Sequence, residues 1–170
     1  MDTAVVATLR PQTWSSPKVE LRPGPEGLGV FAVEAIEVGE VLVCLRHVFV
    51  GQPERHTIQI DEHVHQAGTG EMDDYFNHSC DPNAYLDFQR LQFVARKPLA
   101  PGEEISFNYL TSEWDMAAPF TCGCGSPGCV REIRGFLHLT PAQQEALAPW
   151  LSPYLQRRHA ELLGSERKTA

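Results

Sequence analysis

Residues 77–83 read Asn-His-Ser-Cys-Asp-Pro-Asn, a polar, turn-forming run that carries a single cysteine. A second cysteine cluster, Cys122-x-Cys124-x4-Cys129, lies downstream at chelating spacing. With Cys80 it makes four thiolates, the number that a closed tetrahedral zinc site needs. Three cysteines at this spacing are far more often metal ligands than separately buried thiols. The sequence therefore predicts a structural zinc that ties the end of the chain to its middle.

Composition limits the kinds of partner. The 170 residues fit one domain, and a chain of this length buries about two-thirds of its unfolded surface. A formal net charge of −8 would repel phosphate backbones, so no direct nucleic-acid binding is expected. The same charge would attract a basic peptide or a cationic side chain, although most of the charged residues need serve only to keep the protein soluble.

The chain has no apolar run long enough to cross a bilayer, so no membrane partner is expected. Residues 1–10 lack the charged start and the length of a secretory signal. We therefore expect a cytoplasmic, reducing setting, in which cysteines are metal ligands or buried thiols rather than disulfides. Cys44, inside the apolar run 41–45, is interpreted as a core residue without a chemical role.

Short β-branched and alternating segments dominate the first two-thirds of the chain. We predict strands at 28–33, 41–50, 57–60, 85–88, 91–95 and 104–109. The proline-rich stretch 11–25 is read as a loop or an edge segment, and the polar stretch 63–74 as a loop.

The last third changes character. Thr140-Pro141-Ala142-Gln143 is a capping box with proline at the first helical position. Ser152-Pro153 opens a second helix, which we expect to stop at Gly164. The fold class is therefore mainly β (β+α), with short C-terminal helices.

Four ordered motifs resemble a SET domain with a post-SET zinc motif. They are Gly27-Leu28-Gly29-Val30-Phe31-Ala32, Tyr75-Phe76-Asn77-His78-Ser79-Cys80-Asp81-Pro82-Asn83, Gly102-Glu103-Glu104-Ile105-Ser106-Phe107-Asn108-Tyr109, and Cys122-Gly123-Cys124-Gly125 with Cys129. The resemblance covers roughly residues 17–137 and implies small β-sheets with a pseudoknot, in which one segment threads beneath another. It implies an N-terminal segment 1–16, a SET domain 17–110, a post-SET zinc segment 111–137 and a helical tail 138–170.

The resemblance also implies an S-adenosylmethionine-dependent protein-lysine methyltransferase. Tyr109 takes the catalytic position and lines the substrate channel together with Phe107. A phenylalanine at position 107 leaves room for methylated amines, so di- or trimethylation is implied. The implied cofactor-binding residues are Gly27, Leu28, Gly29, Tyr75, Asn77, His78 and Phe120. Either Phe120 or Trp114 would cover the adenine ring, and either could instead be an ordinary core residue.

Two alternatives stay open. One is an enzyme of the same fold that methylates a small molecule, and the other is a non-catalytic binding module. In the SET family the insert between strand and signature forms one wall of the substrate groove, and here the segment from Ile60 to Tyr75 is very short. We therefore expect an open groove. The helices after residue 140 would pack over the cofactor site, form a dimer surface or cap the fold.

Overall fold

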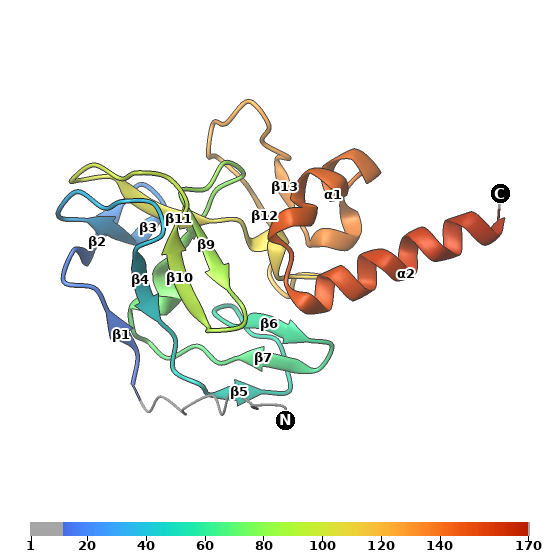
Figure 1. Cartoon of the computed structure of the whole chain (residues 1–170), viewed down its shortest axis with the longest axis horizontal. Helices are drawn as coiled ribbons and strands as arrows, with labels where there is room; N and C mark the ends of the chain where they lie inside the picture. Colours follow the sequence, from blue (N-terminus) through green and yellow to red (C-terminus); the bar gives the residue numbers. More distant parts are fainter. Residues whose placement is uncertain (1–11, 170) are drawn as a thin grey trace, which may run out of the picture.

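The computed structural model describes residues 12–169 (Figure 1), so the expectations for residues 1–10 lie outside the described part. Small antiparallel sheets make up most of the molecule. The first sheet has the order β1 (Trp14–Ser15), β4 (Val41–Cys44), β10 (Gln92–Ala95), β9 (Ala84–Asp87). The second has the order β2 (Val19–Gly24), β3 (Gly27–Ala32), β11 (Glu104–Phe107), β8 (Asn77–His78). The mainly β fold class is confirmed.

Two smaller sheets complete the β structure. One has the order β5 (Phe49–Val50), β7 (Val64–Gln66), β6 (Ile58–Asp61). The other pairs β12 (Phe120–Thr121) with β13 (Glu132–Ile133). The β12–β13 sheet lies between the cysteine-rich segment and the helices in Figure 1.

The proline-rich stretch is an edge strand, which was one of its two predicted states. Pro23 lies in β2, and β2 pairs only with β3 in its sheet. An edge strand tolerates proline because one row of its backbone groups faces away from the ladder. The hairpin turns at Gly27, whose φ of 106° a residue with a Cβ would rarely adopt.

The parallel pairing of β8 with β11 is what builds the site. Ser106 lies opposite Asn77 and Phe107 opposite His78. The Asn83 side chain fixes this register, because it donates to the Glu104 carbonyl at 2.8 Å and accepts from the Ser106 N–H at 2.9 Å. The central signature is thereby held beside the motif that ends in the tyrosine.

Two predictions about local structure were wrong. The predicted strand 41–50 is broken into β4 and β5, because β4 pairs with β1 and β10 whereas β5 turns away to pair with β7. The predicted loop 63–74 contains β7 and the 3-10 helix η1 (Met72–Tyr75). His65 and Gln66 are buried in β7, so tertiary packing outweighs the polar composition of this stretch.

Buried side chains form two clusters. The first lies within the sheets before residue 108 and includes Val30, Phe93 and Ile105; the predicted core residue Cys44 is also buried. Phe76 stacks on Phe93 in this cluster, with ring centroids 3.9 Å apart. The second is built from residues 110–155 and lies under the helices.

The helical tail matches its predicted beginnings but not its predicted end. The helical segments after β11 are η2 (Tyr109–Thr111), η3 (Phe136–His138), α1 (Pro141–Leu147), η4 (Ala148–Trp150) and α2 (Pro153–Thr169). Thr140 and Gln143 form the predicted capping box. Helix α2 continues through Gly164, because one glycine costs only about 1 kcal/mol relative to alanine in a helix.

The beginning of the tail packs into the second cluster. Leu151, Tyr154 and Leu155 are buried in the second cluster, and the far half of α2 extends away from the sheets (Figure 1). Trp150 joins the tail to the first sheet, because its ring lies 5.4 Å from that of Tyr85 and 3.9 Å from the Arg96 guanidinium. No helix in the described residues is long and apolar enough to cross a membrane.

Candidate active site

Tyr109 lies where the last core strand ends. Asn108 caps the 3-10 helix η2 by accepting from the Leu110 N–H at 3.0 Å, which turns the chain directly after β11. The Tyr109 hydroxyl donates to the Phe76 carbonyl at 2.8 Å. Burial raises the pKa of Tyr109 to about 12, so its hydroxyl stays neutral at physiological pH. The oxygen keeps lone pairs to offer to a bound group.

His78 connects Tyr109 to the cysteine cluster. Its Nδ1 accepts from the Tyr109 backbone N–H at 3.2 Å, and its Nε2 lies 3.3 Å from the Cys80 sulfur. Burial lowers the pKa of His78 to about 4, so the ring is neutral. An accepting Nδ1 leaves the single proton on Nε2, which therefore donates toward the sulfur.

Asn77 closes onto the glycine motif. Its side-chain amide donates to the Leu28 carbonyl at 3.2 Å and to the Glu104 carboxylate at 2.7 Å. A Cβ at Gly29 would lie 2.6 Å from Glu104 Oε1 and 3.0 Å from Asn77 Nδ2. A side chain at 29 would therefore displace the Glu104 carboxylate from its place beside Asn77. Glu104 was missed as a site residue, although it stands inside a quoted motif.

The structure separates the two aromatic candidates for a ring cover. Phe120 lies edge-on to both site residues, with ring centroids 5.7 Å from His78 and 6.0 Å from Tyr109. Trp114 instead packs 6.3 Å from Phe136, with the Arg158 guanidinium 4.5 Å from its ring. Phe120 is therefore at the site, and Trp114 belongs to the second cluster.

Tyr75 is less closely connected to this group. Its ring lies 6.3 Å from that of His56 and packs against the first cluster. No described contact joins it to Asn77 or His78, its neighbours in the predicted cofactor set.

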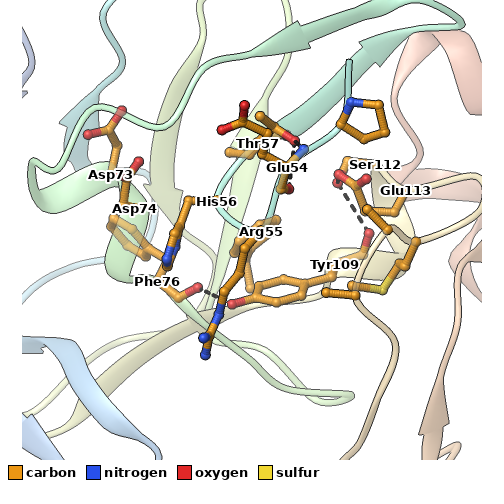
Figure 2. Close-up of a pocket in the computed structure, with 16 residues that line it drawn as sticks. Glu54, Arg55, His56, Thr57, Asp73, Asp74, Phe76, Tyr109, Ser112 and Glu113 are labelled. Carbon is orange, nitrogen blue, oxygen red and sulfur yellow. Dashed lines mark hydrogen bonds between the residues drawn. The ribbon is translucent and has the colours of Figure 1, made fainter.

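A pocket of about 60 Å3 opens beside Tyr109 (Figure 2). Phe76, Phe107 and Tyr109 form one wall, and the segment Pro53–Ile58 forms another. The Phe107 and Tyr109 rings are 4.9 Å apart. Both predicted channel residues therefore line the same pocket. A narrow aromatic passage is suited to an extended apolar chain that ends in a polar group.

The pocket is acidic. Four carboxylates line it, from Glu54, Asp73, Asp74 and Glu113, against the single cation Arg55. None of these four acids was predicted as a site residue, and Glu113 gave no signal because an isolated acid after a predicted strand resembles a solvated loop residue. An anionic lining favours a cationic ligand.

Gln59 joins β6 to the segment after Tyr109. Its backbone N–H donates to Glu113 Oε1 at 2.9 Å, and its side-chain oxygen accepts from the Trp114 N–H at 2.9 Å. These two bonds hold the segment after Tyr109 against β6. The open groove expected from the short insert stays a prediction.

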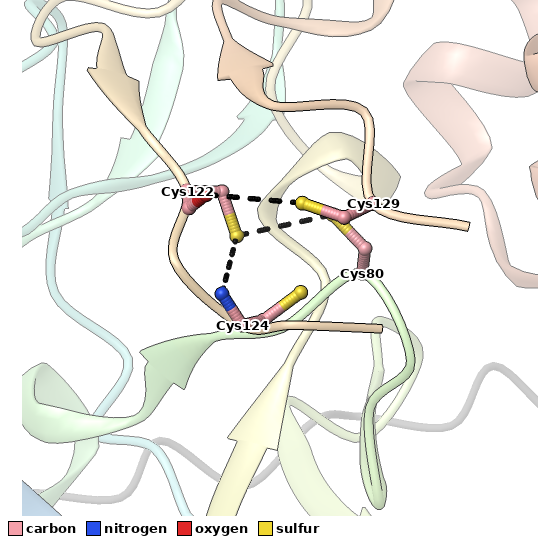
Figure 3. Close-up of side chains that lie close together, drawn as sticks. All are labelled: Cys80, Cys122, Cys124 and Cys129. Atoms are coloured by element: carbon pink, nitrogen blue, oxygen red, sulfur yellow. Dashed lines mark hydrogen bonds between the residues drawn. The ribbon is translucent and has the colours of Figure 1, made fainter. Parts of the chain in front are cut away.

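The four predicted metal-binding cysteines come together (Figure 3). All four sulfurs lie within 4.8 Å of one another, and Cys80 is 4.0 Å from Cys122 and 3.9 Å from Cys129. Tetrahedral coordination with Zn–S bonds of about 2.3 Å places sulfurs roughly 3.8 Å apart. The cluster fits a zinc ion, and its separations are far longer than the bond of a disulfide.

The clustered thiols differ in acidity: against the effect of burial, hydrogen bonds with Ser126 lower the pKa of Cys124 to about 6. Burial raises the pKa of Cys122 to about 11 and raises that of Cys80 as well. Without a cation these thiols would stay protonated at neutral pH, whereas a bound metal holds them as thiolates.

Comparison with known proteins agrees with this geometry. The SET domain family matches residues 27–110. Methyltransferase flvH of Aspergillus flavus is 35% identical over 97 residues, which is 56% of this chain and 51% of that protein. A histone-lysine N-methyltransferase of Candida albicans, H3 lysine-36 specific, is 27% identical over 133 residues, which is 65% of this chain and 16% of that protein. The chain thus spans about half the length of the first relative and a small part of the second.

Solved structures share the fold. The methyltransferase domain of human SETMAR gives a TM-score of 0.53 at 20% identity, covering 66% of this chain and 55% of that one. KRYPTONITE in complex with mCHG DNA and SAH gives a TM-score of 0.53 at 21% identity, covering 67% of this chain and 28% of that one. The matched residues hold the glycine hairpin, the central signature and Tyr109, and the chain is therefore a member of the SET-domain family.

Proposed function

We propose that the chain is an S-adenosylmethionine-dependent methyltransferase that acts on the ε-amine of a protein lysine. The observation that carries this proposal is the position of Tyr109 between two groups of residues. On one side, its backbone contacts His78 and its ring faces Phe120. On the other side, its ring lines the acidic pocket. A residue at such a boundary can touch both a bound cofactor and a bound substrate.

S-adenosylmethionine supplies an electrophilic methyl group on a sulfonium. The methyl forms a bond to nitrogen while its bond to sulfur breaks, so the amine must first give up a proton to free its lone pair. A free lysine has a pKa of about 10.4, and burial next to a positive charge lowers it. The protein's remaining contribution is alignment of nitrogen, methyl and sulfur.

Each residue of the site has a place in this chemistry. The Leu28–Gly29 backbone, with Asn77 and His78, would hold the cofactor, and Phe120 would cover its adenine. The neutral Tyr109 hydroxyl, fixed by its hydrogen bond to Phe76, would orient the amine with its lone pairs. Phe107 and Phe76 would exclude water from the passage.

Two observations support a protein lysine as the substrate. Several relatives are histone-lysine methyltransferases by name, including the H3 lysine-36 specific enzymes of Candida albicans and Aspergillus oryzae. The pocket is narrow, aromatic and acidic, which fits a lysine side chain. No histone is implied for this chain itself, and flvH carries only the general name of methyltransferase.

We further propose that Cys80, Cys122, Cys124 and Cys129 bind one structural Zn²⁺. Four thiolates leave no open coordination position, so the metal would have no catalytic role. The His78 Nε2–H would then donate to a metal-bound thiolate, and such outer hydrogen bonds fix both ligand and ring. Zinc would thereby hold the cofactor-binding histidine in place.

One experiment tests the reaction and the substrate class together. The protein is incubated with methyl-labelled S-adenosylmethionine and a cell extract, and the label is measured in proteins and in small molecules. We expect label on protein lysines, and its loss with Tyr109→Phe. Label in small molecules alone would overturn the protein substrate, and no transfer to either fraction would overturn the enzyme.

A further inference from the structure

Glu113 stands apart from the other acids of the pocket. Its Oε1 accepts two hydrogen bonds, from the Gln59 N–H at 2.9 Å and from the Ser112 hydroxyl at 3.1 Å. Its Oε2 accepts none from the described residues. Both backbone groups are also bonded, the N–H to the Tyr109 carbonyl and the carbonyl to the Phe136 N–H. The side chain is thus held rigidly with one oxygen left over.

This carboxylate has no cation of its own. Within residues 12–169, no Lys, Arg or His forms an ion pair with Glu113. Burial raises its pKa to about 7, with no neighbouring positive charge among the causes. A half-buried carboxylate without a partner is either protonated or paired with a cation, and near neutral pH a cationic ligand can supply that pair.

The other carboxylates are hydrogen-bonded on the opposite side of the pocket or face solvent. Asp74 accepts from the backbone N–H groups of Thr69 and Gly70, at 2.9 and 2.6 Å to its Oδ2. Asp73 accepts from the Thr69 hydroxyl at 2.7 Å. Glu54 is exposed at the rim. Figure 2 shows Asp73 and Asp74 on the far side of the pocket from Glu113.

Glu113 also lies close enough to Tyr109 for its charge to raise the pKa of that hydroxyl. Its carboxylate and the Tyr109 ring line the same small pocket. A cation held by Glu113 in this pocket would therefore lie beside Tyr109.

We infer that Glu113 is the specificity-determining residue of the pocket: its Oε2 pairs with the ammonium of the incoming substrate before methyl transfer. The inference rests on the proposed function for the identity of that cation. It deepens that function, because it makes charge, and not only shape, the feature by which the site selects an amine. The ammonium loses its proton to solvent water only afterwards, before the nitrogen lone pair attacks the methyl group.

The test uses a ligand that needs no knowledge of the full substrate. n-Butylammonium reproduces the four-carbon end of lysine, and 1-butanol is its neutral counterpart of similar size. Binding of each to the full chain is measured by NMR titration. We expect a preference for n-butylammonium of at least roughly tenfold in the native protein, which corresponds to one charge-assisted hydrogen bond.

Glu113→Gln is the informative variant, because its amide oxygen still accepts from Gln59 and Ser112 while the charge is gone. The preference should fall to less than about threefold. Glu145→Gln removes the same charge from an exposed site on α1 and should leave the preference unchanged. An undiminished preference in a folded Glu113→Gln protein would overturn the inference.

Tyr109→Phe separates this inference from the proposed function. It should abolish transfer yet keep the ammonium preference, since Glu113 is untouched. A native protein that binds n-butylammonium through Glu113 but transfers no methyl to any amine would refute the proposed reaction and leave the recognition role intact. Where transfer is seen, Glu113→Gln should raise the KM for the amine and leave the KM for S-adenosylmethionine unchanged.

Discussion

The two buried clusters differ in what holds them together. The first, within the sheets before residue 108, consists of closely packed apolar side chains such as Phe76, Phe93 and Ile105. The second, built mainly from residues 110–155, packs all four clustered cysteines and Phe120 around apolar residues such as Leu110, Phe136 and Leu155. A β core of the first kind folds through apolar burial, whereas a short segment of the second kind needs a metal or another constraint.

The site lies where the two clusters meet. Tyr109 packs against the first, and Phe120 and Cys80 pack against the second. The polar residues Asn77 and His78 connect them through β8. Changes in the second cluster should therefore alter the cofactor side of the site while leaving the first cluster folded, and changes in the first should destroy both.

The largest expected effect is on the first cluster. Phe93→Ala removes a fully buried ring that stacks on Phe76 and should lower the free energy of unfolding by about 3–5 kcal/mol. The whole chain should unfold at lower urea concentration, as measured by circular dichroism. If only residues after 110 lost structure, folding of the second cluster would not depend on the first in the way proposed.

Removal of zinc should affect the second cluster alone. Chelation, or Cys122→Ser, should expose residues 111–137 to rapid amide hydrogen exchange, because metal binding and local folding are coupled. The amides of β4 and β10 should stay protected. Cys44→Ser is the control, because this thiol is buried in β4 and is not one of the four clustered cysteines. If residues 111–137 stayed as well protected as β4 and β10 without metal, the coupling of zinc to local folding would be contradicted.

Glu113 adds a pH dependence to stability. Its pKa is raised from 4.5 to about 7, so the folded protein holds a proton on this group that the unfolded chain releases between these values. Stability therefore falls as pH rises from 4.5 through 7 and levels off above that range. Glu113→Gln should be more stable than the native protein at pH 8, by up to about 3 kcal/mol, and similar to it at pH 4. Urea unfolding at both pH values measures the difference, and equal stability at pH 8 would exclude a buried, unpaired carboxylate.

The smallest expected effect concerns the number of methyl groups transferred. Phe107→Tyr adds a hydroxyl to the channel wall without removing packing. It should leave stability within about 1 kcal/mol and shift the product toward monomethyl-lysine, because the added group competes for the space of a methylated amine. Mass spectrometry of the product measures this, and an unchanged product distribution would remove Phe107 from the channel.

The sequence predicted those parts of the site that are encoded in short motifs. Spacing predicted Cys122, Cys124 and Cys129 as ligands, with Cys80 added to make four thiolates, and motif resemblance predicted Tyr109, Asn77 and His78. It could not predict contacts made across the fold. Glu113 is separated from Gln59 by more than fifty residues, and nothing in the local pattern distinguishes it from a solvated acid.

Local pattern also failed where tertiary packing decides. Residues 63–66 are polar in sequence, yet His65 and Gln66 are buried because β7 pairs with strands on both sides. Trp114 and Phe120 were equivalent candidates by distance along the chain. Only the pairing of β12 with β13 carries Phe120 toward His78.

Binding of S-adenosylmethionine to one protein sample, measured by calorimetry before chelation, after chelation and after zinc is restored, is the most direct test of the link between the two clusters. The arrangement of Cys80, His78 and Tyr109 predicts that affinity falls at least roughly tenfold without zinc and returns when zinc is added. An affinity that stays the same in all three states would contradict the proposal that the metal site completes the cofactor site.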